Sequence, residues 1–405
     1  MKIIYLHQYF NTPEMSGSTR SYEMAKRMVR RGHTVEMITA RTDGLSGRNG
    51  WFVEDVDGIK VHWLNVRYDN SMGIVRRLIA FLLFSFRASI YASRLQGDVV
   101  LASSTPLTIS IPGVRVSRKL KAPLVLEVRD LWPEVPIAMG ALRLPGSIFC
   151  ARRLEAWAYR CAKRIIALSP DMRKGVIATG VPQDKVVCIP NSADVELFQG
   201  DGAAGGRFRA EQSWLGDKPL VLYAGTFGRV NGVDFMVHMA AAMRQLNPDV
   251  RFLAVGGGAK FGEVRELASD LGVLNENFFM ERAVSKARVV ELFAAATVCC
   301  SWVVGLEPLW KNSANKLFDA MAAGKPVVIN YRGWQKDLID QEGIGLVVPV
   351  DDADLAARML DSFLSDEIGL KKAGEAAFSL GKARFSRDML AAEMIEVLER
   401  AAQSS

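Results

Sequence analysis

The chain has 405 residues, 49% of them hydrophobic and 23% charged, a composition that excludes a disordered or fibrous protein. One hydrophobic core rarely organises more than about 300 residues, so the length predicts two domains. The net charge of +7 is uneven: residues 1–195 hold 28 Lys and Arg against 16 Asp and Glu (+12), and the remainder holds 23 against 28 (−5). This bias favours contact with anionic lipid, a phosphate-bearing ligand or nucleic acid over ordinary surface charging.

Five cysteines form an odd set with no CxxC pair and no nearby histidine at metal-ligand spacing. This pattern predicts a reducing compartment and no bound metal. Residues 1–6 enter a strand-like pattern at once, without the basic, apolar and small-residue regions of a leader peptide. We therefore expect a cytoplasmic protein.

Short β-branched runs alternate with helical patterns along the first half of the chain. They occupy residues 2–9, 34–39, 99–103, 123–128 and 164–169. Such near-continuous apolar strands predict a parallel sheet covered by helices on both faces. The same rhythm restarts further on and predicts a second doubly wound α/β domain. Its strands are expected at residues 219–225, 251–258, 297–302 and 326–331.

The weakest pattern lies at residues 199–216, which include the segment GDGAAGG. We place the interdomain linker there, between domains of residues 1–198 and 217–405. A closing amphipathic helix at residues 386–402 has no strand after it and can pack on either domain.

An apolar run at residues 78–86 (LIAFLLFSF) is flanked by Arg76, Arg77 and Arg87. With nine residues it is too short for a membrane span, which needs about 20. Two interpretations stay open: a basic amphipathic helix in the membrane interface, and a helix that buries its apolar face in the domain core.

A glycine-containing turn follows the first predicted strand, in the segment MSGSTR at residues 15–20. Gly17 and Ser18 let a ligand approach the backbone, and the free N–H groups of a helix start attract anions. A cation such as Arg20 in the first helical turn opposes the helix dipole unless an anion is bound, so we interpret this turn as an anion site.

Three charged groups and a tryptophan crowd the loop after a buried strand: Glu127, Arg129, Asp130 and Trp132. Ligands bind at this edge of open α/β sheets, which favours a functional loop. An internal ion pair between Arg129 and Asp130 is the alternative.

Two glycine-rich turns follow successive strands of the second domain, GTFGRVNG at residues 225–232 and GGG at residues 256–258. Their glycines expose the backbone to a ligand, and the guanidinium of Arg229 suits a diphosphate. Two such turns at neighbouring strand ends predict one ligand-binding edge.

The segment NSANKLFDAMAAGKPVV at residues 312–328 predicts a short helix that ends at Gly324, before Pro326. Lys316 and Asp319 share one face of that helix. An ammonium for phosphate and a carboxylate for ribose hydroxyls suit a nucleotide diphosphate; a surface ion pair is the alternative.

Together these segments resemble the retaining glycosyltransferases of family 4, which have the GT-B fold of two Rossmann-like domains and an interdomain cleft. The resemblance covers nearly the whole chain. It rests on the segments GSTRSYEMAKRMVRRGHTVEMIT, VRDLWPE, IPNSADVELF, YAGTFGR and KLFDAMAAGKPVV. The HQYF, DLWPE and NKLFDAMAAGKP segments are most similar to bacterial enzymes that add amino or deoxy sugars, such as N-acetylfucosamine, during O-antigen or capsule assembly.

The resemblance implies a hexosyltransferase that moves a sugar, with retention, from a nucleotide-sugar, expected to be a UDP-sugar, to a lipid-linked or glycan acceptor. The setting would be bacterial surface polysaccharide and lipopolysaccharide synthesis. It implies no metal, no other cofactor and no nucleic acid, and a peripheral position at the inner face of the cell membrane through the basic first domain.

The resemblance also assigns roles to the candidate residues. The catalytic roles fall on Asp130, Arg229 and Lys316. The expected donor-binding residues are Gly17, Ser18, Arg20, Gly225, Thr226, Gly228, Asn231, Gly257, Asn315 and Asp319. The expected acceptor-binding residues are His7, Ser104, Glu127, Arg129 and Trp132.

The sequence departs from the family at three positions of the donor site. Thr226 and Asn231 stand near the usual Arg and Lys, and Lys311 stands at the first of two paired glutamates. Two alternatives therefore stay open: a sugar-nucleotide epimerase or hydrolase of the same fold, and a non-catalytic scaffold subunit. A nicotinamide dehydrogenase is disfavoured because GGG at residues 256–258 is not a GxGxxG turn.

Overall fold

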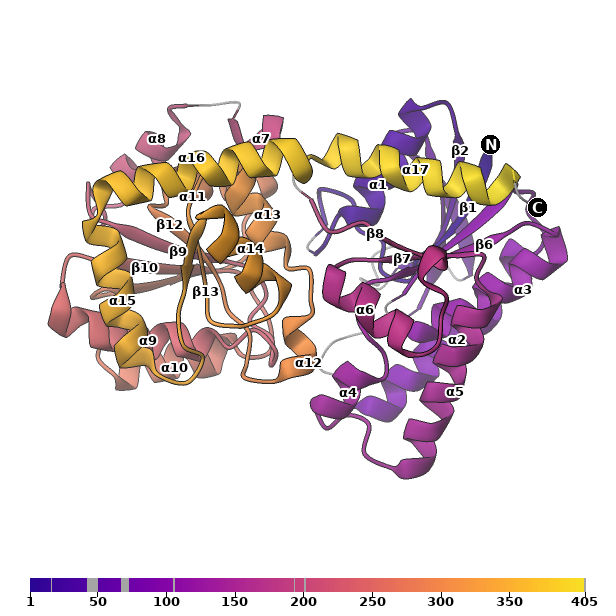
Figure 1. The fold of residues 1–405 in the computed structure, drawn as a ribbon, viewed down its shortest axis with the longest axis horizontal. Helices are drawn as coiled ribbons and strands as arrows, with labels where there is room; N and C mark the ends of the chain where they lie inside the picture. Colours follow the sequence, from indigo (N-terminus) through magenta and orange to yellow (C-terminus); the bar gives the residue numbers. More distant parts are fainter. Residues whose placement is uncertain are drawn as a thin grey trace. The chain divides into compact units, whose positions relative to one another are not determined.

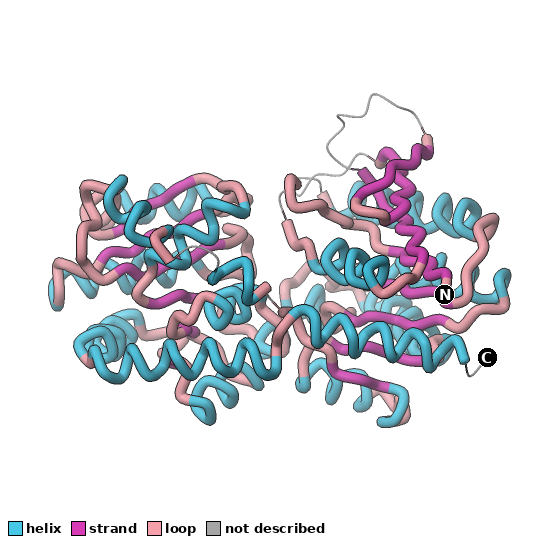
Figure 2. Tube along the Cα trace, turned by 90° about the horizontal axis from the view of Figure 1, so that it is seen from above, coloured by secondary structure: helices cyan, strands magenta, loops and turns pink. Residues whose placement is uncertain are grey.

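The computed structural model describes residues 1–15, 17–41, 50–66, 73–104, 106–192, 194–199 and 202–403. The chain divides into two compact units. Unit 1 comprises Met1–Pro190 and Asp388–Ser405, and unit 2 comprises Asn191–Arg387. Each unit is a sheet with helices on both faces, as the tubes of Figure 2 show, and the predicted doubly wound α/β fold is confirmed.

Unit 1 contains an eight-stranded sheet in the order β3-β4-β2-β1-β5-β6-β7-β8. The strands are β1 (Lys2–Leu6), β2 (Thr34–Arg41), β3 (Trp51–Val56), β4 (Ile59–Asn65), β5 (Val99–Ser103), β6 (Leu124–Val128), β7 (Arg164–Ala167) and β8 (Val186–Cys188). The helices, labelled in Figure 1, are α1 (Arg20–Arg30), α2 (Ile74–Ala92), α3 (Ser110–Leu120), α4 (Glu134–Ala138), α5 (Pro145–Cys161), α6 (Pro170–Ala178) and α17 (Arg387–Gln403).

The edge of the unit 1 sheet differs from the all-parallel prediction. Strands β3 and β4 form an antiparallel hairpin, while the remaining pairs in this sheet are parallel. The hairpin turns at Asp57 and Gly58, which both have positive φ (52° and 81°). This is the backbone conformation that an Asp-Gly pair favours in a two-residue hairpin.

Alternate residues of the central strands define one face of the unit 1 sheet. Ile4 and Leu6 of β1 belong to a buried cluster that also contains Phe84 of α2, Val114 of α3 and Ala158 of α5. Helix α3 packs against both α2 and α5. These three helices therefore cover the same face.

Unit 2 contains a six-stranded parallel sheet in the order β11-β10-β9-β12-β13-β14. The strands are β9 (Leu220–Ala224), β10 (Arg251–Val255), β11 (Phe278–Glu281), β12 (Val298–Ser301), β13 (Val327–Ile329) and β14 (Gly345–Val347). The helices are α7 (Val195–Gln199), α8 (Ala204–Glu211), α9 (Val233–Leu246), α10 (Phe261–Asp270), α11 (Lys286–Ala295), α12 (Glu307–Trp310), α13 (Asn315–Ala322), α14 (Trp334–Glu342), α15 (Ala353–Ser365) and α16 (Glu367–Arg384).

The linker predicted at residues 199–216 is corrected by the structure. Helix α8 lies inside this range and packs against α11 of unit 2. The contact is close, because a Cβ on Gly205 would lie 2.7 Å from the carbonyl carbon of Ala294. The glycines of this segment thus serve helix packing; residues 200 and 201 lie outside the described residues.

The chain crosses from unit 1 to unit 2 between Pro190 and Asn191, and it returns between Arg387 and Asp388. Helix α17 therefore belongs to unit 1 from Asp388 onward. Asp388 Oδ1 pairs with Arg27 Nε at 2.5 Å, and Glu399 Oε1 lies 3.3 Å from His33 Nε2. Of the two placements that the sequence left open for the last helix, the structure has the one on the first domain.

Candidate functional site

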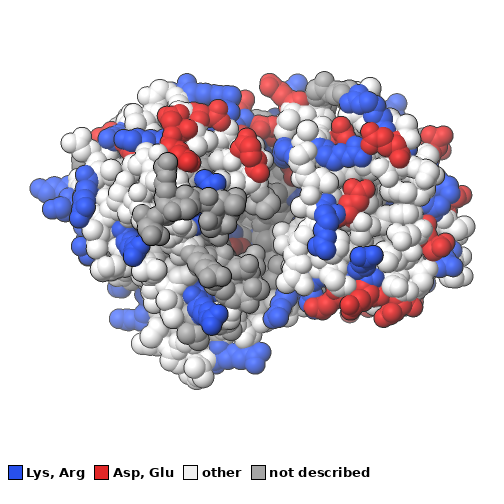
Figure 3. Space-filling model, turned by 180° about the vertical axis from the view of Figure 1, so that it is seen from behind, with Lys and Arg blue, Asp and Glu red and all other residues white. Residues whose placement is uncertain are grey.

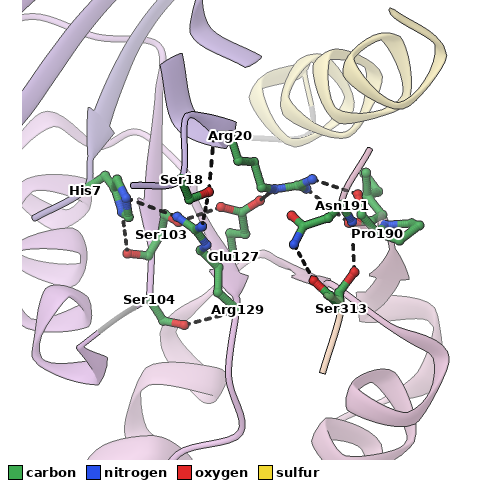
Figure 4. A network of polar contacts seen from close by, with 11 residues as sticks. His7, Ser18, Arg20, Ser103, Ser104, Glu127, Arg129, Pro190, Asn191 and Ser313 are labelled. Carbon is green, nitrogen blue, oxygen red and sulfur yellow. Dashed lines mark hydrogen bonds and ion pairs between the residues drawn. The ribbon is translucent and has the colours of Figure 1, made fainter. Parts of the chain in front are cut away.

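The carboxyl edge of the unit 1 sheet is the first candidate site. The strand order reverses between β1 and β5, and open α/β sheets bind ligands at such a switch point. His7, Ser104 and Arg129 follow β1, β5 and β6. In Figure 4 they lie near Ser18 and Arg20, at the start of α1. The edge thus brings together side chains that are far apart in the sequence.

A buried ion pair lies beneath this edge. Arg20 Nε donates to Glu127 Oε1 at 3.0 Å, and Ser103 Oγ donates to Glu127 Oε2 at 2.5 Å. The Glu127 side chain is fully buried. Burial opposes its ionisation, but Arg20 and Arg129 outweigh that effect and hold the pKa of Glu127 below its usual value. Glu127 is therefore a buried carboxylate, enclosed away from any ligand at the surface.

Arg20 has a different role from the predicted anion ligand. It is 6% exposed, and its Nη1 and Nη2 donate to the carbonyl oxygens of Pro190 and Ile189 at 2.7 and 3.1 Å. With Glu127 on Nε, the guanidinium is used within the protein on all three nitrogens. Arg20 therefore holds Ile189 and Pro190, where the first segment of unit 1 ends, against the start of α1. The spacing of residues along the sequence could not reveal this contact.

His7 and Arg129 form a second pair at the same edge. Burial, followed by the charge of Arg129, lowers the pKa of His7 to about 3, so the imidazole is neutral at physiological pH. Its Nε2 accepts from Arg129 Nη1 at 3.1 Å, and its Nδ1 lies 3.5 Å from the Ser103 carbonyl oxygen. Arg129 Nη2 donates to Ser18 Oγ at 3.1 Å. Arg129 is thereby oriented by two uncharged acceptors.

One of the cations at this edge is accessible. Arg20 and Arg129 contribute two positive charges, whereas Glu127 contributes one negative charge. The half-buried Arg129 is the member of this group with an accessible surface. Asp130 follows Arg129 in the same loop, so Arg129 is the accessible cation of an edge that also carries carboxylates, and its guanidinium can contact an anionic group.

The other predicted residues of unit 1 lie at the same edge. Asp130 and Trp132 are half-buried in the loop between β6 and α4, and the Trp132–Pro133 peptide bond is cis. Gly17 is exposed and has a φ of 129°. A Cβ there would lie 2.6 Å from Asn11 Nδ2, so the turn requires a glycine. Ser16 of the predicted turn lies outside the described residues.

Two glycine-rich turns form the second candidate site, at the carboxyl edge of the unit 2 sheet. Strands β9 and β10 are neighbours, and their turns pack backbone against backbone. A Cβ on Gly256 would lie 1.8 Å from the Gly225 carbonyl oxygen, and one on Gly258 would lie 2.6 Å from that of Phe227. Nothing lies within 4 Å of the corresponding position on Gly257. Gly256 and Gly258 thus join the turns, and Gly257 leaves backbone accessible.

Lys316, near the start of α13, reaches these turns. Its ammonium lies 4.9 Å from the centre of the Tyr223 ring, and a Cβ on Gly225 would lie 2.3 Å from Lys316 Cε. Gly225 therefore makes room for the lysine. Burial lowers the pKa of Lys316 to about 8, while Cys300 and Asp319 act in the opposite direction. The site thus holds a half-buried cation beside accessible backbone.

The remaining predicted residues of unit 2 surround Lys316 on the turn and on α13. Thr226 and Arg229 are exposed on the turn after β9. Gly228 lies against Asn231, since a Cβ would be 2.8 Å from Asn231 Oδ1. Asn315 is exposed as the first residue of α13. Asp319 is half-buried one turn further on.

Three residues of the sites were missed by the sequence analysis. Ser103 and Tyr223 lie within predicted strands, where only the end position indicates a role. Asn191 is the third: its backbone N–H donates to Ser313 Oγ at 3.0 Å, and its Nδ2 donates to the Ser313 carbonyl at 2.5 Å (Figure 4). These bonds fix the start of unit 2 to the segment before α13.

Two protein-family models match the chain. Residues 17–192 match the "Glycosyl transferase 4-like domain", and residues 206–379 match the "Glycosyl transferases group 1" model. The two matches include both candidate sites, apart from His7.

Curated relatives agree with this match, and a solved structure shares the fold. The probable glycosyltransferase WbjE of Pseudomonas aeruginosa is 27% identical over 72% of this chain and 71% of its own length. The putative colanic acid biosynthesis glycosyl transferase WcaI of Escherichia coli K12 is 25% identical over 66% of this chain and 69% of its own. Anabaena HepE, solved in complex with UDP-glucose, is similar in fold, with a TM-score of 0.72, 18% identity and 99% and 100% of the two chains covered.

Proposed function

The chain belongs to the glycosyltransferases with a 4-like first domain and a group 1 second domain, and we propose that it transfers a sugar from a nucleotide-sugar bound by unit 2 to an acceptor bound by unit 1. The single observation that carries the donor site is Lys316, whose cation lies over Gly225 beside the two glycine turns. Backbone amides and one half-buried cation suit a diphosphate.

The donor is proposed to be a UDP-sugar. HepE binds UDP-glucose at a similar fold, and the resemblance of NKLFDAMAAGKP to amino-sugar transferases favours an N-acetylated amino or deoxy sugar. The acceptor is proposed to be a lipid-linked or glycan intermediate of bacterial surface polysaccharide, such as O-antigen or capsule. The relative WcaI supports this setting, because its name assigns it to colanic acid biosynthesis.

The position of Arg129 favours an acceptor that carries a negatively charged group. Its half-buried guanidinium, oriented by His7 and Ser18, suits the phosphate or diphosphate of a lipid-linked sugar. Asp130, in the same loop, would orient the attacking hydroxyl. Because such an acceptor lies in a bilayer, the enzyme would work as a peripheral protein at the inner face of the membrane.

Departure of the nucleoside diphosphate builds negative charge on its β-phosphate. Lys316, Arg229 and the backbone of residues 225–228 and 257 would stabilise that charge in place of a metal ion, which is the kind of electrostatic contribution that dominates many enzymes. Retention would follow from attack on the face that the leaving group vacates. No role in this step is proposed for Arg20, because its three guanidinium nitrogens already donate to Glu127, Pro190 and Ile189.

The experiment that tests the donor site compares three variants by donor turnover and by calorimetric titration with UDP. Lys316→Ala and Arg229→Ala should each lower kcat/KM by about tenfold or more, because a charge-assisted contact contributes ~1.5–3 kcal/mol. Lys371→Ala, at an exposed lysine on α16, is the control and should behave as the wild type. Wild-type turnover in the first two variants would refute their roles.

Further arms of that experiment separate the alternatives. Donor consumed without any acceptor would indicate an epimerase or hydrolase, and absence of UDP binding would indicate a scaffold subunit. Activity lost with EDTA and restored by magnesium would contradict a site that relies on protein cations alone.

A further inference from the structure

Helix α2 is apolar on two opposite faces. Phe81, Phe84 and Ala88 are buried against unit 1, and this face accounts for the packing of the helix. A helix that only covers a sheet needs one apolar face and a polar one opposite. The outward face of α2 therefore needs a separate explanation.

That outward face carries large apolar side chains in a continuous stripe. Five residues at helical spacing are between 41% and 62% exposed: Leu78, Ile79, Leu82, Leu83 and Phe86. They make up five of the thirteen exposed large hydrophobic side chains among the described residues. Leu144 and Phe149, at the start of α5, add two more at 73% and 65%. Soluble surfaces rarely concentrate apolar side chains in this way.

The exposed charged side chains of α2, α3 and α5, the helices that cover one face of the unit 1 sheet, are all basic. Helices α2, α3 and α5 each contain three Lys or Arg, nine in all, and their single acidic residue, Glu155, is buried. Arg76 and Arg87 of α2 and Arg152 and Arg153 of α5 are exposed. In Figure 3 the lower part of unit 1, at left, shows blue side chains among white ones, and the red ones gather at its upper edge. An acidic or neutral partner surface would complement this face.

We propose that α2, α3 and α5 dock unit 1 on an anionic lipid bilayer, with the α2 stripe and Phe149 in the interface and the arginines at the headgroups. We favour a bilayer over an acidic protein because exposed arginines stand at both ends of the apolar run of α2, at Arg76 and Arg87, and the three helices carry no exposed acidic residue, a pattern typical of helices that lie in a membrane interface. No helix of the described residues is long and apolar enough to cross a bilayer. The surface is thus suited to lie in the interface.

This inference concerns a surface and does not depend on transferase activity. It is tested by sedimenting the full chain with vesicles of phosphatidylcholine alone or with 30% phosphatidylglycerol. The wild type should bind the anionic vesicles, and high salt should weaken that binding. Leu82→Asn with Phe86→Asn should lower the partition coefficient at least tenfold, since apolar burial is lost. Arg76→Gln with Arg87→Gln should lower it about fivefold per charge.

Matched controls come from unit 2. Ile368→Asn removes a side chain that is 70% exposed, and Lys371→Gln with Lys372→Gln removes two exposed charges; all should bind as the wild type. Circular dichroism and thermal unfolding verify that each variant is folded. Equal binding to both vesicle types, or equal loss in the unit 2 variants, would overturn the proposal. So would a dimer in sedimentation velocity that the Leu82 and Phe86 variant abolishes, which would assign the face to a second copy.

Discussion

Three arginines near the candidate sites show that surroundings, not residue type, decide what a guanidinium can bind. Arg20 is buried and paired with Glu127, Arg129 is half-buried on uncharged acceptors, and Arg229 is exposed on a turn. The sequence predicted all three as ligand-binding residues. Only burial and partners separate them, and neither follows from spacing along the chain.

At the residue scale, Lys316 makes nucleotide binding dependent on pH. Because its pKa is lowered to about 8, the ammonium is charged below that pH and loses its proton as the pH rises through it. The affinity for UDP should fall by about twofold between pH 7 and 8, where the charged fraction halves, and then by up to about tenfold per pH unit. Calorimetric titration with UDP between pH 6.5 and 9.5 measures this dependence.

The matched variants for this profile are Lys316→Arg and Lys316→Met. An arginine stays charged throughout, so its profile should lack the decline above pH 8, and the methionine variant should be weak and flat. A wild-type affinity that stays level to pH 9.5 would contradict the assignment of Lys316 to the diphosphate.

At the element scale, strands buried on both faces were the most predictable features. Apolar runs mark β1, β5 and β12 directly. Most of the missed strands are short or exposed: β8, β11 and β14 have three or four residues, and Phe52 is the single buried residue of β3. Strand β4 was missed although five of its seven residues are buried. The hairpin signal at Asp57 and Gly58 was present but was not used. Tertiary pairing, rather than local pattern, makes these edge strands.

The turns after β9 and β10 form one element because Gly256 contacts Gly225. Gly256→Ala should lower the free energy of unfolding by more than about 2 kcal/mol, since its Cβ would lie 1.8 Å from a carbonyl oxygen at a φ of 151°. Gly257→Ala is the control one residue away, with nothing within 4 Å, and should stay close to the wild type. Urea unfolding measures both, and equal midpoints would show that the turns can separate at little cost.

At the scale of the whole molecule, the sequence predicted two doubly wound domains but placed the boundary wrongly. It took residues 199–216 for a linker because glycines there weaken the helical pattern, yet α8 lies in that range and packs on α11. The true crossings lie at Pro190 and Arg387; the first has the turn residues Pro190, Asn191 and Ser192, but this signal is shorter than the glycine-rich one at residues 199–216. Arg20, Asn191 and Asp194 hold the chain at these points, and such contacts join residues that are more than a hundred positions apart.

Because α17 completes unit 1, its core residues should stabilise a sheet that lies at the other end of the sequence. Leu398 is fully buried, and Leu398→Ala should cost about 2–5 kcal/mol. The exchange of backbone amide hydrogens should then become faster in α1, β1 and β2 of unit 1, because proteins unfold locally in cooperative units. Leu360→Ala, at an equally buried leucine in α15 of unit 2, should instead increase exchange around β9 and β10. If the Leu398 variant loosened β9 and β10 as much as β1, the two units would have to unfold as one.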